Sequence, residues 1–169
     1  MSIRSVVLDH PAPLVWLWEA LSRLLRALPG AFRRLGIERS SRWVGVVEHP
    51  LKRAVFGCRE CGQCVLHTTG MTCPMTCPKE LRNGPCGGVC RDGKCEADPE
   101  MDCVWVQAIE RAGRTRYALD VHLVNPAPDW RRRGRSSWVG YALEANEPLA
   151  GGGETPLSAL DVLQPPGAP

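Results

Sequence analysis

Cysteine is absent from most of this sequence, since none occurs in residues 1–57 or 104–169. Long apolar runs are also absent: no stretch approaches the ~20 consecutive apolar residues of a membrane-spanning helix. The first residues show no uninterrupted apolar segment with a small-residue cleavage site, so no secretory signal is predicted. We therefore expect a cytoplasmic protein without a membrane span, in a compartment where thiols stay reduced.

Aliphatic side chains are scarce where the cysteines gather. Residues 58–103 hold all nine cysteines but only four large aliphatic residues, which are Val65, Leu66, Leu81 and Val89. Such a segment cannot form a core by hydrophobic burial, and metal ligation is the usual alternative in small segments. Nine thiols in a reducing compartment favour metal over disulfides, which remain a third alternative.

The charge is modest and unevenly spread. The net charge of +3 is too small to predict nucleic-acid binding. A slightly acidic cysteine-rich centre lies between two basic flanking segments. The basic run 131–135 with Trp130 and Trp138 has the mixture found in single-strand binders, but it is short, so we expect no nucleic-acid partner. The two tryptophans either anchor an arm on a protein partner or close over the chain's own cysteine domain.

Hydrophobic periodicity predicts a few regular elements. Apolar residues at helical spacing predict an amphipathic helix over 12–28, ended by Pro29 and Gly30. We favour a helix that docks on a partner over one packed on its own domain, because little else in the chain could cover its Leu/Trp stripe. Shorter segments suggest a helix at 31–35, a strand or helix start within 42–56, a helix at 104–112 and a weakly alternating strand at 115–124.

The cysteines follow a pattern of four groups: Cys58-x2-Cys61-x2-Cys64, Cys73-x3-Cys77, Cys86-x3-Cys90-x4-Cys95, and Cys103. A triplet spaced by two residues can place thiolates on three corners of an iron–sulfur cubane, with a fourth ligand from elsewhere. Zinc sites more often use separated pairs, so residues 58–64 favour iron–sulfur, while 86–103 leave zinc and a second cluster open. Two four-cysteine sites need eight thiolates, which leaves one spare.

The predicted fold class is a small, mostly irregular metal-stabilised domain with a few short α-helices, an N-terminal amphipathic helix and an extended C-terminal arm. The final residues are rich in Gly, Pro and Ala, which predicts disorder. The expected parts are an N-terminal helical arm (1–47), a cysteine-rich iron–sulfur domain (48–112), an extended partner-binding arm (113–145) and a disordered tail (146–169).

These motifs resemble the methylenetetrahydrofolate reductase C-terminal domain family. The similarity lies in residues 56–64, 73–79, 82–88, 92–96 and 103–106, and more weakly in 129–131 and 136–138. It includes the run Arg82-Asn83-Gly84-Pro85-Cys86, and it does not extend to residues 1–30 or 146–169.

The resemblance implies cofactors and ligands. Members of this family occur as the small subunit of two-subunit methylenetetrahydrofolate reductases, whose larger subunit is a TIM barrel holding flavin and folate. By this resemblance the chain carries two [4Fe-4S] clusters, or one [4Fe-4S] cluster plus one Zn. The cysteines that match the family pattern are Cys58, Cys61, Cys64, Cys73, Cys77, Cys86, Cys95 and Cys103. Cys90 does not match it and is the candidate spare thiol, with metal ligation as its alternative.

The resemblance also implies a function in one-carbon metabolism. We expect an iron–sulfur electron-transfer subunit that exchanges electrons with the flavin of the larger tetrahydrofolate-processing subunit, with an external electron-transfer protein as a further partner. The glycine run 151–153 lacks the strand–turn–helix context of a phosphate-binding loop, so we expect a non-catalytic subunit of an oxidoreductase. The alternative is a zinc-stapled structural or adaptor subunit.

Overall fold

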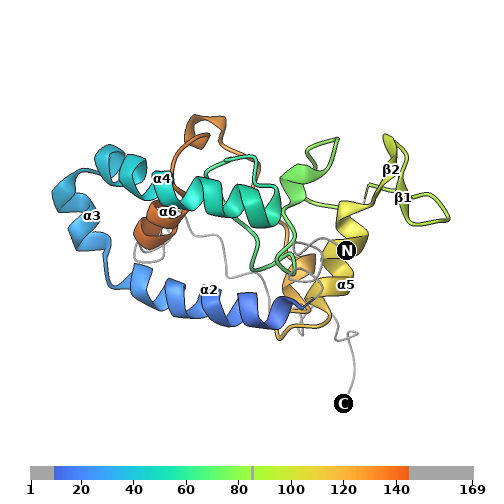
Figure 1. Cartoon of the computed structure of the whole chain (residues 1–169), viewed down its shortest axis with the longest axis horizontal. Coiled ribbons are helices and arrows are strands. Elements are labelled where there is room, and N and C mark those ends of the chain that lie inside the picture. The colour runs from blue at the N-terminus through green and yellow to red at the C-terminus, as the bar shows by residue number, and fades with distance from the viewer. Residues whose placement is uncertain (1–9, 85, 145–169) are drawn as a thin grey trace, which may run out of the picture.

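Most of the helices form one end of the molecule, and one further helix, loops and a short β-hairpin form the other (Figure 1). The computed structural model describes residues 10–84 and 86–144, so the predicted tail at 146–169 lies outside the described residues. The α-helices are α2 (Pro11–Arg26), α3 (Pro29–Leu35), α4 (Ile37–Phe56), α5 (Val104–Ala112) and α6 (Ser137–Glu144). Between them lie the 3₁₀-helices η1 (Pro74–Thr76), η2 (Asp120–His122) and η3 (Trp130–Arg132), and the strands β1 (Lys94–Cys95) and β2 (Asp98–Asp102).

Helices α2 and α4 run in opposite directions and are joined by α3 (Figure 1). Helix α2 confirms the predicted amphipathic helix. Helix α2 ends before Pro29 and Gly30, as predicted. These two residues form the first turn of α3, where proline is tolerated because its missing N–H has no helical partner to lose.

Helix α4 settles the open prediction for residues 42–56 in favour of a helix, which begins earlier, at Ile37. It ends at Gly57, whose φ of 65° lies in the left-handed region that favours glycine at a helix C-terminus. The Gly57 N–H donates to the Arg53 carbonyl at 3.0 Å, and the Cys58 N–H to the Lys52 carbonyl at 3.3 Å. The end of α4 therefore fixes where the first cysteine leaves the helix.

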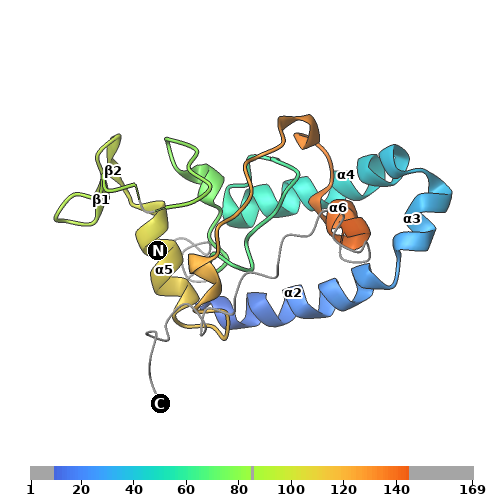
Figure 2. The ribbon, with the colours of Figure 1, turned by 180° about the vertical axis from the view of Figure 1, so that it is seen from behind.

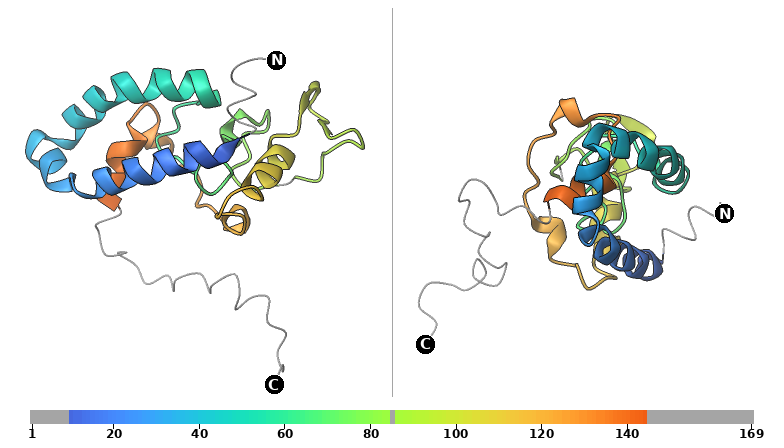
Figure 3. Two further views of the ribbon diagram at one scale, coloured as in Figure 1. Left: turned by 60° about the horizontal axis from the view of Figure 1, so that its bottom comes forward. Right: turned by 90° about the vertical axis from the view of Figure 1, so that its left-hand side faces the viewer.

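Helix α6 packs between α2 and α4 (Figure 3). It shares a core with α2 and α3 that is made of Leu25, Phe32, Val139 and Ala142. The sequence predicted an irregular arm here and missed this helix. With only eight residues it is too short to be stable by local propensity, so tertiary contacts must supply its stability.

The other end of the molecule is built around α5, which confirms the predicted helix at 104–112. Strands β1 and β2 are antiparallel, with Lys94 opposite Asp102 and Cys95 opposite Asp98. The strand predicted at 115–124 is wrong: this segment forms turns and η2, and its backbone groups bond locally, as in Thr115 N–H to Ala112 and Asp120 N–H to Tyr117.

The described residues thus form a small domain with five α-helices and one two-stranded sheet, more helical than the sequence predicted. Two further small cores stand beside the one at α6, and both include cysteines. One joins Val15, Leu66, Met71, Cys73 and Met75, and the other joins Cys103, Trp105, Ala108, Ala112 and Val121. Among the described helices, none combines the length and apolarity that crossing a membrane requires.

Candidate metal centre

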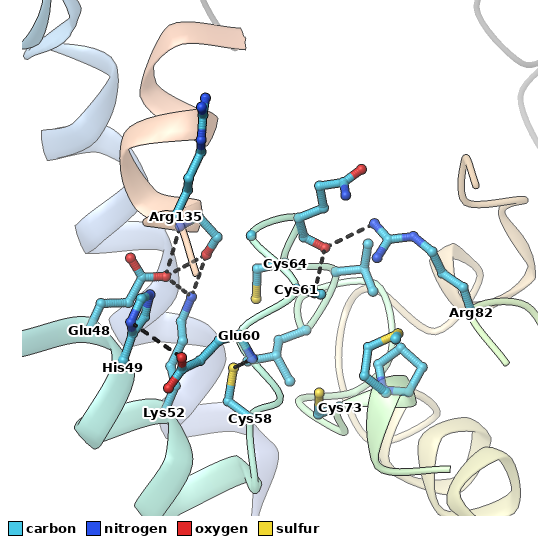
Figure 4. A pocket seen from close by; sticks show the side chains of 17 residues that line it. Glu48, His49, Lys52, Cys58, Glu60, Cys61, Cys64, Cys73, Arg82 and Arg135 are labelled. Carbon is cyan, nitrogen blue, oxygen red and sulfur yellow. Dashed lines mark hydrogen bonds and ion pairs between the residues drawn. The ribbon is translucent and has the colours of Figure 1, made fainter. Parts of the chain in front are cut away.

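Four cysteines from two separate groups of the sequence pattern line one cavity. Cys58, Cys61 and Cys64 come from the loop after α4, and Cys73 comes from the residue before η1. Figure 4 shows these side chains around a common space. Cys73 is buried and the other three are half-buried. Leu66, Met75 and Pro74 line the same cavity and help to shield the thiols from water. The structure therefore groups the sequence triplet with Cys73.

The loop that carries the triplet is held in a tight shape by its backbone. Glu60 and Gly62 both have positive φ angles, 55° and 74°. This turn lets the Glu60 N–H donate to Cys58 Sγ at 3.3 Å, while Cys61 Sγ donates to the Gln63 carbonyl at 3.7 Å. An N–H group that donates to sulfur, as that of Glu60 does, stabilises a thiolate and tunes the reduction potential of a metal centre bound to it.

The segment before α6 crosses over this loop (Figure 2). The Gly134 N–H donates to the Glu60 carbonyl at 2.9 Å, and the Gln63 side chain donates to the Asp129 carbonyl at 3.1 Å. The contact is close at Gly62, where an added Cβ would lie 2.1 Å from the Arg132 carbonyl oxygen. Glycine at this position is required by both backbone angle and space.

We expect Gly62→Ala to lower the unfolding temperature of the metal-loaded chain more than Gly134→Ala. Both glycines have positive φ, but an added Cβ at Gly134 meets nothing within 4 Å. Gly134→Ala should therefore lower the free energy of unfolding only by the backbone strain, about 1–2 kcal/mol. Gly62→Ala should add to that strain the cost of displacing η3. Thermal unfolding under anaerobic conditions measures both, and equal losses would contradict the close approach at Arg132.

Burial makes two of the thiols in this cavity hard to ionise. It raises the pKa of Cys73 to about 12, and it also raises the pKa of Cys58. A buried thiolate is unfavourable without a compensating cation, so these groups would release their protons when metal binds. The donor set is thus four cysteine sulfurs in a shielded cavity, which fits a cluster that requires thiolate ligands.

A buried ion pair lies beside the cysteines. Lys52 Nζ donates to Glu48 Oε1 at 2.6 Å and to Ser137 Oγ at 2.7 Å. Burial by itself would lower the pKa of the Lys52 amine, but the negative charges of Cys64 and Glu48 outweigh it and raise that pKa. Figure 4 shows the amine between Glu48 and the side of the cavity that carries Cys58 and Cys64. The cavity therefore has a permanent cation at one wall.

Glu48 also fastens α6 in place. Burial tends to raise the pKa of its carboxyl, but the charge and hydrogen bonds of Lys52 and the hydroxyls of Ser136 and Ser137 hold it below the usual value. The carboxylate accepts from the backbone N–H groups of Ser137 and Trp138 at 3.2 and 3.3 Å. A carboxylate at a helix N-terminus satisfies donors that lack a partner within the helix.

The remaining predicted ligands lie at the other end of the molecule. Cys95 is buried in β1, Cys103 is buried just before α5, and Cys77 is buried just after η1. Cys86 is exposed, and Lys79 Nζ lies 3.9 Å from its sulfur. Cys90, the candidate spare thiol, is exposed in the turn before β1. The cavity that the first four cysteines line includes none of these five.

In the described part of the chain, no three or more His, Cys, Asp or Glu residues stand close enough to hold a single metal ion. Metal ligation by each predicted cysteine stays a prediction. Sequence reasoning did not single out Glu48 or Lys52, and it named Arg82 only as part of a family motif, without a role. All three line the first cavity. The i, i+4 spacing of Glu48 and Lys52 is typical of an ion pair on one face of a helix. It could indicate such a pair only if residues 42–56 were predicted to be helical.

Comparison with known proteins agrees with the motifs. A family model described as methylene-tetrahydrofolate reductase C terminal matches residues 38–131, more than half of the chain. The match runs from the first turn of α4 into η3, and it includes all nine cysteines. No curated protein and no solved structure matches the chain. The chain belongs to the methylenetetrahydrofolate reductase C-terminal family.

Proposed function

We propose that the chain is the iron–sulfur electron-transfer subunit of a cytoplasmic methylenetetrahydrofolate reductase complex. The observation that carries this proposal is the cavity lined by Cys58, Cys61, Cys64 and Cys73. Four cysteine sulfurs are the ligand set of a [4Fe-4S] cluster, and the C-x2-C-x2-C spacing suits three corners of its cubane. When bound, such a cluster accepts and releases single electrons. The family membership supports a role beside a larger reductase subunit.

The chain's own residues would hold and shield that cluster. The four sulfurs are the proposed ligands, the Glu60 N–H donates to one of them, and Leu66 and Met75 keep water from the cavity. The Lys52 amine faces the negative charge of the ligands. Cation and N–H donors near a cluster are ordinary means by which a protein sets its reduction potential.

A second cluster on Cys77, Cys86, Cys95 and Cys103 is the further part of this proposal. Cys95 and Cys103 are brought close in the fold, since the Cys103 N–H donates to the carbonyl of Gly93, two residues before Cys95. Lys79 Nζ lies 3.9 Å from Cys86 Sγ and pairs with Glu96, the residue after Cys95, so one side chain contacts both segments. Zinc would use the same four cysteines and is the alternative for this site.

The surface of α4 supports docking on a larger partner. Its inner face buries the polar or small residues Ser40, Ser41, Gly45, Glu48 and Lys52, and its outer face exposes Trp43, Val46, Val47 and Leu51. Trp43 is 72% exposed. This is the reverse of the usual distribution in a helix of a free-standing domain, and exposed apolar patches of this kind mark protein interfaces.

Helix α2 extends that surface. Trp16, Leu17 and Leu24 are exposed on it, and an apolar groove of about 120 Å³ lies between α2 and α4. The carboxylates of the two helices are each engaged by a cation: Glu19 by Arg116, Glu38 by Arg135 and Glu48 by Lys52. Exposed arginines on α2, α3 and α4 therefore favour a partner surface that is apolar with acidic groups around it. We propose that the flavin-containing larger subunit supplies this surface.

Anaerobic co-expression with that larger subunit tests the proposal. We expect the two chains to co-purify as a brown complex whose small subunit holds about eight iron and eight acid-labile sulfide per chain, the content of two cubanes. About four of each plus one zinc would support the alternative for the second site. A colourless, iron-free complex that contains only zinc would overturn electron transfer and support the adaptor function. Failure to co-purify would contradict the proposed partner.

A further inference from the structure

Arg82 is a buried cation with unused hydrogen-bond donors. Arg82 is only 6% exposed, and its Nη2 donates to the Gln63 carbonyl at 2.9 Å. Nε and Nη1 are buried as well, and neither has a hydrogen-bond partner among the described residues. A buried charged group whose donors are unpaired destabilises the fold. We therefore expect Nε and Nη1 of Arg82 to have an acceptor outside the described residues.

Arg82 lines two cavities. In one of them the carboxylates of Asp129 and Glu144 are already paired with Arg131 and Arg132, so we expect the acceptor in the other, the cysteine cavity. Arg82 lines the cavity together with the four cysteines, and Gln63, which anchors it, lies between Cys61 and Cys64 in the chain. Figure 4 shows the guanidinium reaching toward the loop that carries these two cysteines. Lys52 approaches from the opposite side of the view. The two cations differ, since Lys52 is neutralised by Glu48 at 2.6 Å, whereas Arg82 forms no ion pair with a carboxylate of the described residues.

The segment that carries Arg82 is fixed by contacts outside the cavity. The Trp105 indole N–H donates to the Leu81 carbonyl at 3.2 Å, and an added Cβ at Gly84 would fall 2.5 Å from the Trp105 ring. Asn83 and Asn125 exchange hydrogen bonds, each at 2.8 Å, between side chain and backbone. The guanidinium is therefore presented to the cavity by a rigid support, which is how a protein lowers the entropy cost of a directed contact.

We propose that Arg82 is the residue that compensates the charge of the cluster at Cys58, Cys61, Cys64 and Cys73, with Nε and Nη1 donating to its sulfur atoms. This inference rests on the proposed function. Four thiolates around a cubane are net anionic in both oxidation states and more so after reduction. One electron from an external donor enters the cluster, and no bond forms or breaks. A cation at the sulfurs favours the reduced form and so raises the reduction potential.

The test uses the full chain, purified without oxygen, with the variants Arg82→Met and Arg82→Lys. The control is Arg53→Gln, which removes an exposed arginine that pairs with Glu60 near the same cavity. Iron and sulfide content are measured first, and then the midpoint potential by a redox titration followed by electron paramagnetic resonance. We expect Arg82→Met to lower the equilibrium constant for one-electron reduction about tenfold, a potential about 59 mV more negative. Arg53→Gln should shift it much less, because solvent screens that charge.

Arg82→Lys keeps the charge but loses the planar set of donors, so its potential should fall between those of wild type and Arg82→Met. A loaded Arg82→Met chain with the wild-type potential would overturn the proposal. If Arg82→Met retains no iron, Arg82→Lys decides: full iron with a lowered potential supports donation to sulfur, and full iron with the wild-type potential, or no iron, overturns it. An iron-free wild-type chain would instead sink the proposed function itself, so the two failures are distinct.

Discussion

A Cys73→Ser chain, purified without oxygen, should lose about four iron and four acid-labile sulfide relative to wild type, the content of one cubane. Cys73 is the member of the cavity that lies outside the Cys58–Cys64 triplet, and it is only 8% exposed. A serine hydroxyl does not ionise readily enough to replace a thiolate, and the cavity that Cys73 lines includes no cysteine beyond the triplet to take its place. Iron and sulfide assays with the electron paramagnetic resonance spectrum measure the loss.

The matched control for Cys73→Ser is Cys90→Ser. Cys90 is exposed and does not line the first cavity, so its replacement should leave iron and sulfide unchanged. If Cys73→Ser kept its full iron content while Cys90→Ser lost four, the grouping of Cys73 with the triplet would be wrong. If both lost iron, Cys90 would be a ligand of the second site rather than a spare thiol.

Glu48→Ala should destabilise the metal-loaded chain by about 3–5 kcal/mol. Glu48 is 1% exposed, and its removal would leave the Lys52 ammonium buried without its carboxylate. The N-terminus of α6 would lose an acceptor for the N–H groups of Ser137 and Trp138 at the same time. Urea unfolding under anaerobic conditions, followed by helical circular dichroism, measures this difference.

Glu38→Ala is the matched control for Glu48→Ala. Glu38 also lies on α4 and pairs with Arg135, just before α6, at 2.7 Å, but both side chains are at least half exposed. An exposed pair of this kind contributes about 0–1 kcal/mol. Losses of similar size in the two variants would show that the burial of Glu48 and Lys52 adds nothing to stability.

The Glu48 carboxylate also makes stability depend on pH. Its pKa in the folded chain lies below the ordinary value of 4.5, so its contribution is fully present above about pH 4.5 and is lost as the pH falls through the folded pKa. The stability of Glu48→Ala should therefore fall less steeply than that of wild type on the acid side of pH 4.5. If the stability of the two chains fell equally steeply below pH 4.5, this assignment would be wrong.

Much of the chemistry was visible in local sequence. The gathering of all nine cysteines in 46 residues, with few aliphatic residues among them, predicted metal ligation before any fold was known. The periodic leucines of α2 and the short apolar run of α5 predicted both helices, because a 3.6-residue period is a property of neighbouring residues alone. The motifs around the cysteines also indicated the family that the comparison identified.

Other features depend on residues far apart in the chain. Helix α6 escaped prediction because the carboxylate that satisfies its first N–H groups comes from Glu48, 89 positions before Ser137. The strand predicted at 115–124 failed because its residues bond to nearby turns rather than to a neighbouring strand. The leucines of α2 indicated an amphipathic helix, but only the packing of α6 shows which of them are covered and which remain exposed.

In the cysteine centre, too, some features follow from local sequence and others from contacts between distant residues. The sequence by itself determined that the side chains are thiols and that they follow a C-x2-C-x2-C spacing, since both are local. Only the tertiary structure decided that Cys73 joins the triplet and that Lys52 and Arg82 stand at the walls of their cavity. The physical reason is that spacing limits which thiolates a single loop can offer, whereas a cavity and its charges are made by segments that meet only when the chain has folded.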